Sequence, residues 1–244
     1  MTGSTDGSKV RGWYLLKTRD FGFLWSGQLV SQIGDGLNKV ALLWFVYSLT
    51  GSALKMTIIG LLQTLPALLF APVIGVYLDR MQKKWLMVWI DLARTVLVLL
   101  IPVLYSLGAL TLERIYVLVF LTAIASTTFG PALTSSVPLI VARPQLTAAN
   151  ALMQSGVNVA VLVGPAMSGV GIALIGEQNV LFINAGTYLV SALCLLPVRI
   201  QSAQAVPDSV SSGTFMSDIL VGFALCFFRN ERSYSCWSPS LCLT

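Results

Sequence analysis

Long apolar runs separated by short polar breaks dominate this chain. The windows of roughly twenty or more residues that carry few charges are 21–49, 56–78, 86–108, 115–137, 149–175 and 179–197. A membrane hydrocarbon core about 30 Å thick requires a helix of about 20 apolar residues. A transmembrane β-barrel would instead alternate apolar and polar residues over segments of about 10 residues. The pattern therefore predicts an all-α polytopic membrane protein with six transmembrane helices.

The composition agrees with that prediction and narrows the possible functions. Hydrophobic residues make up 56% and charged residues 10% of the chain, whereas a soluble domain has about 25% charged residues. The chain has no histidine, and its four cysteines, Cys194, Cys226, Cys236 and Cys242, form no Cys-x-x-Cys pair. Ordinary zinc sites and histidine-based catalysis are thereby excluded, so we expect no enzyme and no cofactor.

The placement of lysine and arginine predicts the orientation, because cytoplasmic loops of membrane proteins are enriched in both. With a cytoplasmic N-terminus, the inside carries Lys9, Arg11, Lys17, Arg19, Arg80, Lys83, Lys84, Arg143, Arg199, Arg229 and Arg232. The outside carries Lys55 and Arg114. We therefore expect both termini in the cytoplasm of a bacterial inner membrane. The same bias explains the net charge of +5, and no basic stripe with interleaved aromatic residues indicates a nucleic-acid partner.

Four polar side chains of the first predicted span share one helix face. Gln28, Gln32, Asp35 and Lys39 are spaced by four, three and four residues. A charge at the centre of a span costs about 2.5–3.5 kcal/mol on insertion scales, so the stripe should face a bundle interior or an aqueous cavity. Asp35 could pair with Lys39 and bind a proton or contact a substrate. Alternatively, the stripe supplies only interhelical hydrogen bonds, worth about 0.6 kcal/mol each.

A second charged pair lies near the cytoplasmic start of the third predicted span. Asp91 and Arg94 are three residues apart, and Arg94 can extend toward the membrane interface while it pairs with Asp91. We interpret the two residues as a structural pair, and a role in transport is the alternative.

Segment 75–84 is a short polar, basic connection between the second and third predicted spans. Gly75 would let two helices approach closely, and Asp79 could hold one conformational state by meeting helix N-termini or basic groups. Arg80, Lys83 and Lys84 would face anionic lipid headgroups. These residues predict a cytoplasmic gating loop, and a basic loop without a gating role is the alternative.

Small residues recur along the fifth predicted span. Gly156, Gly164 and Gly169 would permit close helix packing, while Pro165 leaves a carbonyl unpaired and favours a bend. Generic packing of small residues, without any role in transport, is the competing interpretation.

Both motifs resemble those of the major facilitator superfamily. The Gly, Asp-Arg and Lys-Lys spacing in 75–84 is similar to the loop signature between that superfamily's second and third spans. The run 155–169 is similar to its fifth-span antiporter motif, although Ser168 replaces one glycine of the usual terminal pair. Residues 13–200 resemble an N-terminal half, most closely in the drug/proton antiporter branch that includes macrolide and siderophore exporters.

The resemblance implies a fold and a function. The six helices would form one half, a 3+3 inverted repeat, of a two-half fold with a central cavity. The function would be secondary active transport by proton-coupled efflux, with a small amphipathic molecule or drug, protons and the lipid bilayer as partners. Many members carry an arginine in the fourth span that pairs with the loop acid, whereas 115–137 contains no charge. If Asp79 holds one conformational state, it must therefore pair with a group other than a fourth-span arginine.

Composition also predicts the domain boundaries. Residues 1–12 form a disordered cytoplasmic N-terminus, 13–200 the six-helix bundle and 201–214 a cytoplasmic linker. Residues 215–244 resemble the approach to a seventh span and then become rich in Ser, Cys and Arg, which indicates a truncated, frameshifted second half. The alternatives are a half-size protein that needs a homodimer or a separate second half, and a non-transporting fragment or membrane interaction subunit.

Overall fold

The computed structural model describes residues 13–78 and 82–198, and all regular structure within them is helical. The helices are α1 (Trp13–Lys17), α2 (Arg19–Thr50), α3 (Ala53–Leu78), α4 (Lys83–Ser106), α5 (Leu112–Ile140), the 3-10 turn η1 (Arg143–Gln145), α6 (Leu146–Ile175) and α7 (Glu177–Leu195). The predictions for the N-terminal segment, for Asp79 and Arg80, and for the linker and tail lie outside the described residues.

Helices α2 to α7 each coincide, within a few residues, with one of the windows expected from hydropathy. The prediction of an all-helical protein is therefore confirmed for the described residues. Within the described residues, five helices are long and apolar enough to cross a membrane, namely α3, α4, α5, α6 with η1, and α7. The remaining long helix, α2, does not meet that measure, because its polar stripe interrupts the apolar sequence.

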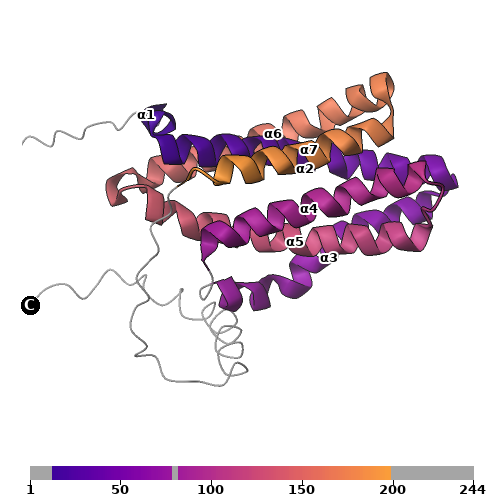
Figure 1. The fold of residues 1–244 in the computed structure, drawn as a ribbon, viewed down its shortest axis with the longest axis horizontal. Helices are drawn as coiled ribbons and strands as arrows, with labels where there is room; N and C mark the ends of the chain where they lie inside the picture. Colours follow the sequence, from indigo (N-terminus) through magenta and orange to yellow (C-terminus); the bar gives the residue numbers. More distant parts are fainter. Residues whose placement is uncertain (1–12, 79–81, 199–244) are drawn as a thin grey trace, which may run out of the picture. The chain divides into compact units, whose positions relative to one another are not determined.

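The long helices form one bundle in which α2 has the most helix neighbours. Helix α2 packs against α3, α6 and α7, while α4 lies between α5 and α7, and α3 packs on α5. Successive long helices run in alternating directions along the bundle (Figure 1). The chain enters α2 through α1, whose Leu15 is buried in a cluster with Phe21 and Val137. The bundle thus brings α2, α4, α5 and α7 together around one interior region.

Tight glycine turns make two of these helix pairs antiparallel neighbours. Gly51 ends α2 with φ +60°, and its N–H donates to the Tyr47 carbonyl at 2.8 Å. Gly176, with φ +82°, is the single residue between α6 and α7. An L side chain rarely adopts such φ values, whereas glycine does so without steric cost. These turns leave no room for a long loop on that side of the bundle.

The distribution of polar and apolar side chains fits a lipid environment. Large apolar side chains such as Leu68, Leu162 and Leu174 are 76–79% exposed, whereas Asp91 and Arg94 are buried. Water would penalise such extensive apolar exposure, but lipid tails do not. Charged groups in hydrocarbon face a bundle interior, as these do. The chain is therefore an integral membrane protein.

Candidate functional site

A buried arginine between two carboxylates lies at the centre of the bundle. The Arg94 Nη1 atom lies 3.7 Å from Asp91 Oδ1 on the same helix and 4.0 Å from Asp35 Oδ2 on α2. The side chains of Arg94 and Asp91 are 3% and 0% exposed, whereas that of Asp35 is 33% exposed. The Asp35–Arg94 ion pair therefore joins α2 to α4. Of the three charged side chains, Asp35 alone has a substantial exposed surface.

Helices α5 and α7 complete the environment of these charges. The Tyr188 hydroxyl donates to Asp35 Oδ1, and the Ser191 hydroxyl donates to Asp91 Oδ2 at 2.7 Å. The Arg94 guanidinium lies 5.1 Å from the ring centroid of Tyr188 and 5.3 Å from that of Phe129. Aromatic faces stabilise a cation at such distances, and the contact is stronger where water is excluded. We call Asp35, Asp91, Arg94, Tyr188 and Ser191 the charge cluster.

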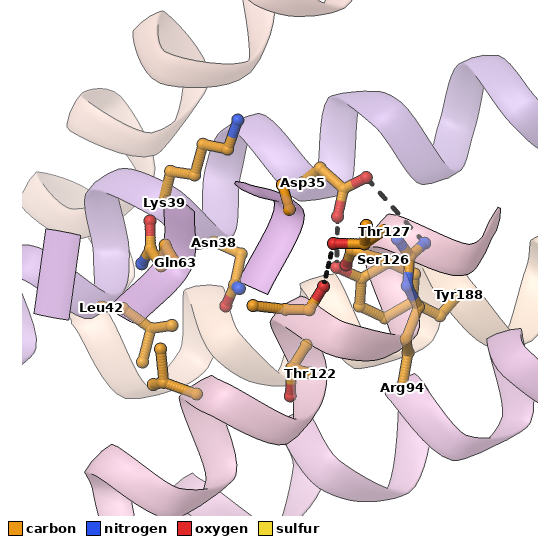
Figure 2. Close-up of a pocket in the computed structure, with 13 residues that line it drawn as sticks. Asp35, Asn38, Lys39, Leu42, Gln63, Arg94, Thr122, Ser126, Thr127 and Tyr188 are labelled. Atoms are coloured by element: carbon orange, nitrogen blue, oxygen red, sulfur yellow. Dashed lines mark hydrogen bonds and ion pairs between the residues drawn. The ribbon is translucent and has the colours of Figure 1, made fainter. Parts of the chain in front are cut away.

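A polar cavity opens beside the charge cluster. It has a volume of about 270 Å³ and is bounded by α2, α3, α4, α5 and α7. Figure 2 shows Asp35 directed toward Arg94 and Tyr188 at one end of the cavity. Its remaining polar wall consists of amides, hydroxyls and one ammonium, from Asn38, Lys39, Gln63, Thr122, Ser126 and Thr127. The apolar part of the lining comes from Leu42, Ala67, Val119 and Ala123.

The predicted polar stripe of α2 divides along this cavity. Asp35 and Lys39 both line the cavity, whereas Gln28 and Gln32 are not among the described residues of its wall. The side-chain oxygens of Gln28 and Gln32 are buried without a hydrogen bond among the described residues. Asp35 pairs with Arg94 (Figure 2), and among the described residues it forms no ion pair with Lys39. The expected pairing of Asp35 with Lys39 is therefore replaced by a contact between helices.

The basic end of the bundle contains contacts that the sequence did not predict. Lys84 Nζ donates to the Leu196 carbonyl at 2.6 Å, and Lys83 Nζ donates to the Ser135 carbonyl at 3.3 Å. The start of α4 is thus tied to the end of α7 and to α5. Gly75 lies within α3, four residues before Asp79, the first of the residues 79–81 that the structure does not describe.

Helices α2 and α6 are in contact through glycines. A Cβ atom added to Gly164 would lie 2.8 Å from Gly36 Cα and 3.0 Å from the Ile33 carbonyl oxygen. The neighbouring Ser168 hydroxyl donates to the Leu37 carbonyl at 3.0 Å.

The other small residues of α6 lie in different environments. Gly156 is buried, and an added Cβ would make only ordinary contacts with Trp25 and Leu29 at 3.6 Å. Gly169 has open space where its Cβ would be. Pro165 continues within α6, and its ring approaches Gly36. The close helix contact is therefore concentrated at Gly164.

Sequence reasoning did not include the polar residues of α7 in the site. Asn184, Tyr188 and Ser191 are spaced by four and three residues, which places them on one helix face. That spacing matches the stripe of α2 and was the available signal. The hydroxyls Thr122 and Ser126 on α5 are similarly four residues apart. Such residues are easily overlooked because single hydroxyls are common within apolar spans.

A charge cluster beside a polar cavity, enclosed by apolar helices, is typical of a membrane protein that binds and moves a small polar or charged species. Comparison with known proteins defines the class further. A family model described as transmembrane secretion effector, of the major facilitator superfamily, matches residues 11–229. The chain belongs to this family of transporters, as the resemblance of its motifs predicted.

Individual relatives support the same family. The chain is 27% identical to macrolide efflux protein A of Streptococcus pyogenes over 79% of its own length and 46% of the relative's. It is 27% identical to the multidrug efflux pump Tap of Mycolicibacterium fortuitum over 82% of its length and 50% of the relative's. The chain is 25% identical to YvqJ, an uncharacterized MFS-type transporter of Bacillus subtilis, over 85% of its own length and 50% of the relative's. The chain thus spans about half the length of the curated relatives it matches.

Proposed function

We propose that this chain is the N-terminal half of a secondary active transporter that exports a small amphipathic molecule. The observation that carries the proposal is the polar cavity around Asp35 in a member of a transporter family. Its walls combine charged groups, hydroxyls and amides with the apolar side chains of Leu42 and Val119, which suits an amphipathic ligand. Similarity to proteins named for macrolide and multidrug efflux supports efflux as the direction.

Helix α2 is the first span of the proposed half, which then has six spans together with α3 to α7. It has 32 residues, which at 1.5 Å per residue gives a length of about 48 Å, well over the thickness of a membrane core. Its charged residue Asp35 is paired with Arg94 rather than exposed to lipid, which lowers the cost of crossing. Helices α2–α4 and α5–α7 would then be the two three-helix units of an inverted repeat.

The end of the bundle at which α2 begins faces the cytoplasm in this proposal. Lys17, Lys83, Lys84 and Arg143 lie at the helix ends on that side, and the positive-inside rule favours this orientation. The bacterial plasma membrane is the expected location.

The loop after Gly75 belongs to the cytoplasmic gate, with Asp79 and Arg80 as the residues that change partners between states. Replacing Asp79 with Asn should alter the transport rate of the complete transporter. Unchanged flux would remove Asp79 from the gate.

Proton coupling is assigned to Asp35. This carboxylate is the exposed member of the charge cluster, so it can exchange protons with water in the cavity. Protonation removes the charge that holds Arg94 against α2, and it therefore shifts the balance between conformations that differ in this contact. Gln28, Gln32 and Lys39 would set the polarity of the path along α2.

The proposal needs a second wall for the cavity, because substrate sites of this superfamily lie between two halves. A separate second half or another copy of this chain would supply it. The alternative function is that of a non-transporting fragment or a membrane interaction subunit that acts only as a dimer or with a partner half.

Flux in liposomes separates these possibilities. The purified chain is reconstituted with a pH gradient, and movement of a fluorescent amphipathic dye is followed for the wild type, Asp35→Asn and Glu113→Gln. Glu113 is an exposed acid in the first turn of α5, so it serves as a matched control. Gradient-dependent flux that Asp35→Asn abolishes and Glu113→Gln retains supports a proton-coupled exporter. Absence of flux in the wild type supports the fragment or subunit instead.

A further inference from the structure

Two carboxylates share a single guanidinium in the charge cluster. Asp35 and Asp91 both contact the same nitrogen, Nη1, of Arg94, and neither contact is as short as a hydrogen bond. When both acids are ionised, the cluster carries one negative charge in excess. That charge lies where Arg94 and Asp91 are almost completely enclosed, so leaving it uncompensated is costly.

No other cation that the structure describes compensates this charge. From α2, Lys39 is exposed at the cavity wall and forms no ion pair with either carboxylate among the described residues. From α3, the polar residue of the cavity wall is the neutral Gln63, and α5 contributes hydroxyls and the Phe129 ring. From α7 come the hydroxyls of Tyr188 and Ser191. Helix α6 contains no ionisable residue. One bound proton is therefore what makes the enclosed cluster neutral.

The two carboxylates differ in how well they tolerate the negative charge. Asp35 is one-third exposed and accepts the Tyr188 hydroxyl, so both water and a hydrogen bond stabilise its ionised form. The Asp91 carboxylate is fully buried, and among the described residues it accepts a hydrogen bond only from the Ser191 hydroxyl, at Oδ2. Its other oxygen, Oδ1, is buried without any hydrogen bond among the described residues. Among the carboxylate oxygens of the cluster, Asp91 Oδ1 is therefore the one best placed to carry a proton.

We propose that Asp91 is a second proton-binding residue of this transporter, which holds the proton behind Arg94 while Asp35 stays ionised at the cavity. The inference rests on the proposed proton-coupled function and extends it. In one state Asp35 is ionised, Arg94 pairs with it and Asp91 is protonated. In the other state the proton has passed from Asp91 to Asp35, where it can exchange with water in the cavity, and Arg94 pairs with the ionised Asp91. Each state contains one proton and no excess charge.

Infrared spectroscopy of the purified full-length chain in detergent tests this assignment without any transport. A protonated carboxyl gives a C=O stretching band that is separate from the bands of ionised carboxylates. The wild type should show one such band at neutral pH. Asp91→Glu should keep one band but move it to the frequency of a glutamic acid. Arg94→Gln should increase the band, because neither acid then has a cation partner, and Glu113→Gln should leave it unchanged.

Three outcomes would overturn the proposal. One is a wild type without a protonated carboxyl at neutral pH. Another is a band that stays at the aspartic acid frequency in Asp91→Glu, because Asp35 would then carry the proton. The third is a band that persists in Asp91→Asn. The Glu variant keeps the test decisive if Asp91→Asn fails to fold. A failure of dye flux with the expected spectra would refute the transport function but not the proton site.

Discussion

At the scale of single residues, the contact between α2 and α6 makes a sharp prediction about Gly164. An alanine there would place its Cβ 2.8 Å from Gly36 Cα, which is backbone and cannot rotate away. The helices must separate, and overpacking of this kind costs about 1–3 kcal/mol. Gly164→Ala should therefore lower the thermal unfolding temperature of the purified protein in detergent.

Gly169 is the matched control on the same helix. Its Cβ position is open, so Gly169→Ala should be neutral or slightly stabilising, since alanine favours helix over glycine by about 1 kcal/mol. Equal unfolding temperatures for the two variants would mean that the glycine contact does not hold α6 against α2.

Ser168 makes a second residue-scale prediction. Its buried hydroxyl donates to the Leu37 carbonyl on α2. Ser168→Ala removes this hydrogen bond and should destabilise the bundle by about 0.6 kcal/mol, the typical value between membrane helices. Ser155 is exposed and bonds only to Ala151 of its own helix, so Ser155→Ala should have a smaller effect. Thermal unfolding of both variants would check the difference, and a larger loss for Ser155→Ala would contradict it.

The residues of the site could be predicted only in part from the sequence. Helical spacing placed Asp35 and Lys39 on one face, and both line the cavity. Spacing within a helix also suggested two ion pairs, one between Asp35 and Lys39 and one between Asp91 and Arg94. The contact of Asp35 with Arg94 joins positions 59 residues apart, and it depends on how α2 packs beside α4. No local pattern contains that information.

At the scale of elements, hydropathy was a good guide to existence and type but not to contacts. The six windows correspond to α2–α7 because a long, mainly apolar segment satisfies its backbone hydrogen bonds most readily as a helix. Helix ends differ from the windows by a few residues because polar residues such as Lys83 and Glu177 begin helices that hydropathy starts later. The hydrogen bonds from lysine side chains to backbone carbonyls of other helices could not be predicted, because they depend on how the helices pack.

One such hydrogen bond gives an element-scale prediction. Lys84 at the start of α4 donates to the carbonyl of Leu196, the residue that follows the last turn of α7. A carbonyl at a helix C-terminus has no partner within its own helix, and a cation there is favourable. Lys84→Met keeps the apolar stem and removes the donor, so the net cost should be about 0.5–1.5 kcal/mol.

Hydrogen exchange would locate that effect. The amides in the last turn of α7 should exchange faster in Lys84→Met than in the wild type, while those of α6 should not change. Lys55→Met, at the opposite end of the bundle, is the control and should leave α7 unaffected. Unchanged exchange at the end of α7 in Lys84→Met would show that this hydrogen bond contributes nothing to holding the two helices together.

At the scale of the whole molecule, the described helices turn large apolar side chains outward and enclose the charges of Asp91 and Arg94. Leu162 and Leu174 of α6 are largely exposed, while the ion pairs of Arg94 lie in the interior. This arrangement is stable only if lipid covers the outside. The cavity, by contrast, requires water or a ligand, because its wall carries Asp35 and Lys39. The molecule therefore needs two different environments, which a membrane with an aqueous path provides.

Orientation in that membrane gives the last prediction, for which α5 is the best helix. Its 29 residues span about 44 Å at 1.5 Å per residue, and exposed arginines lie at its two ends, Arg114 in its first turn and Arg143 just after it. In a background where the four cysteines are replaced by serine, Arg114→Cys should react with a membrane-impermeant thiol reagent in intact cells. Arg143→Cys should react only after the cells are permeabilised. Labelling of both from one side would mean that α5 does not cross the membrane, and the reverse pattern would invert the proposed orientation.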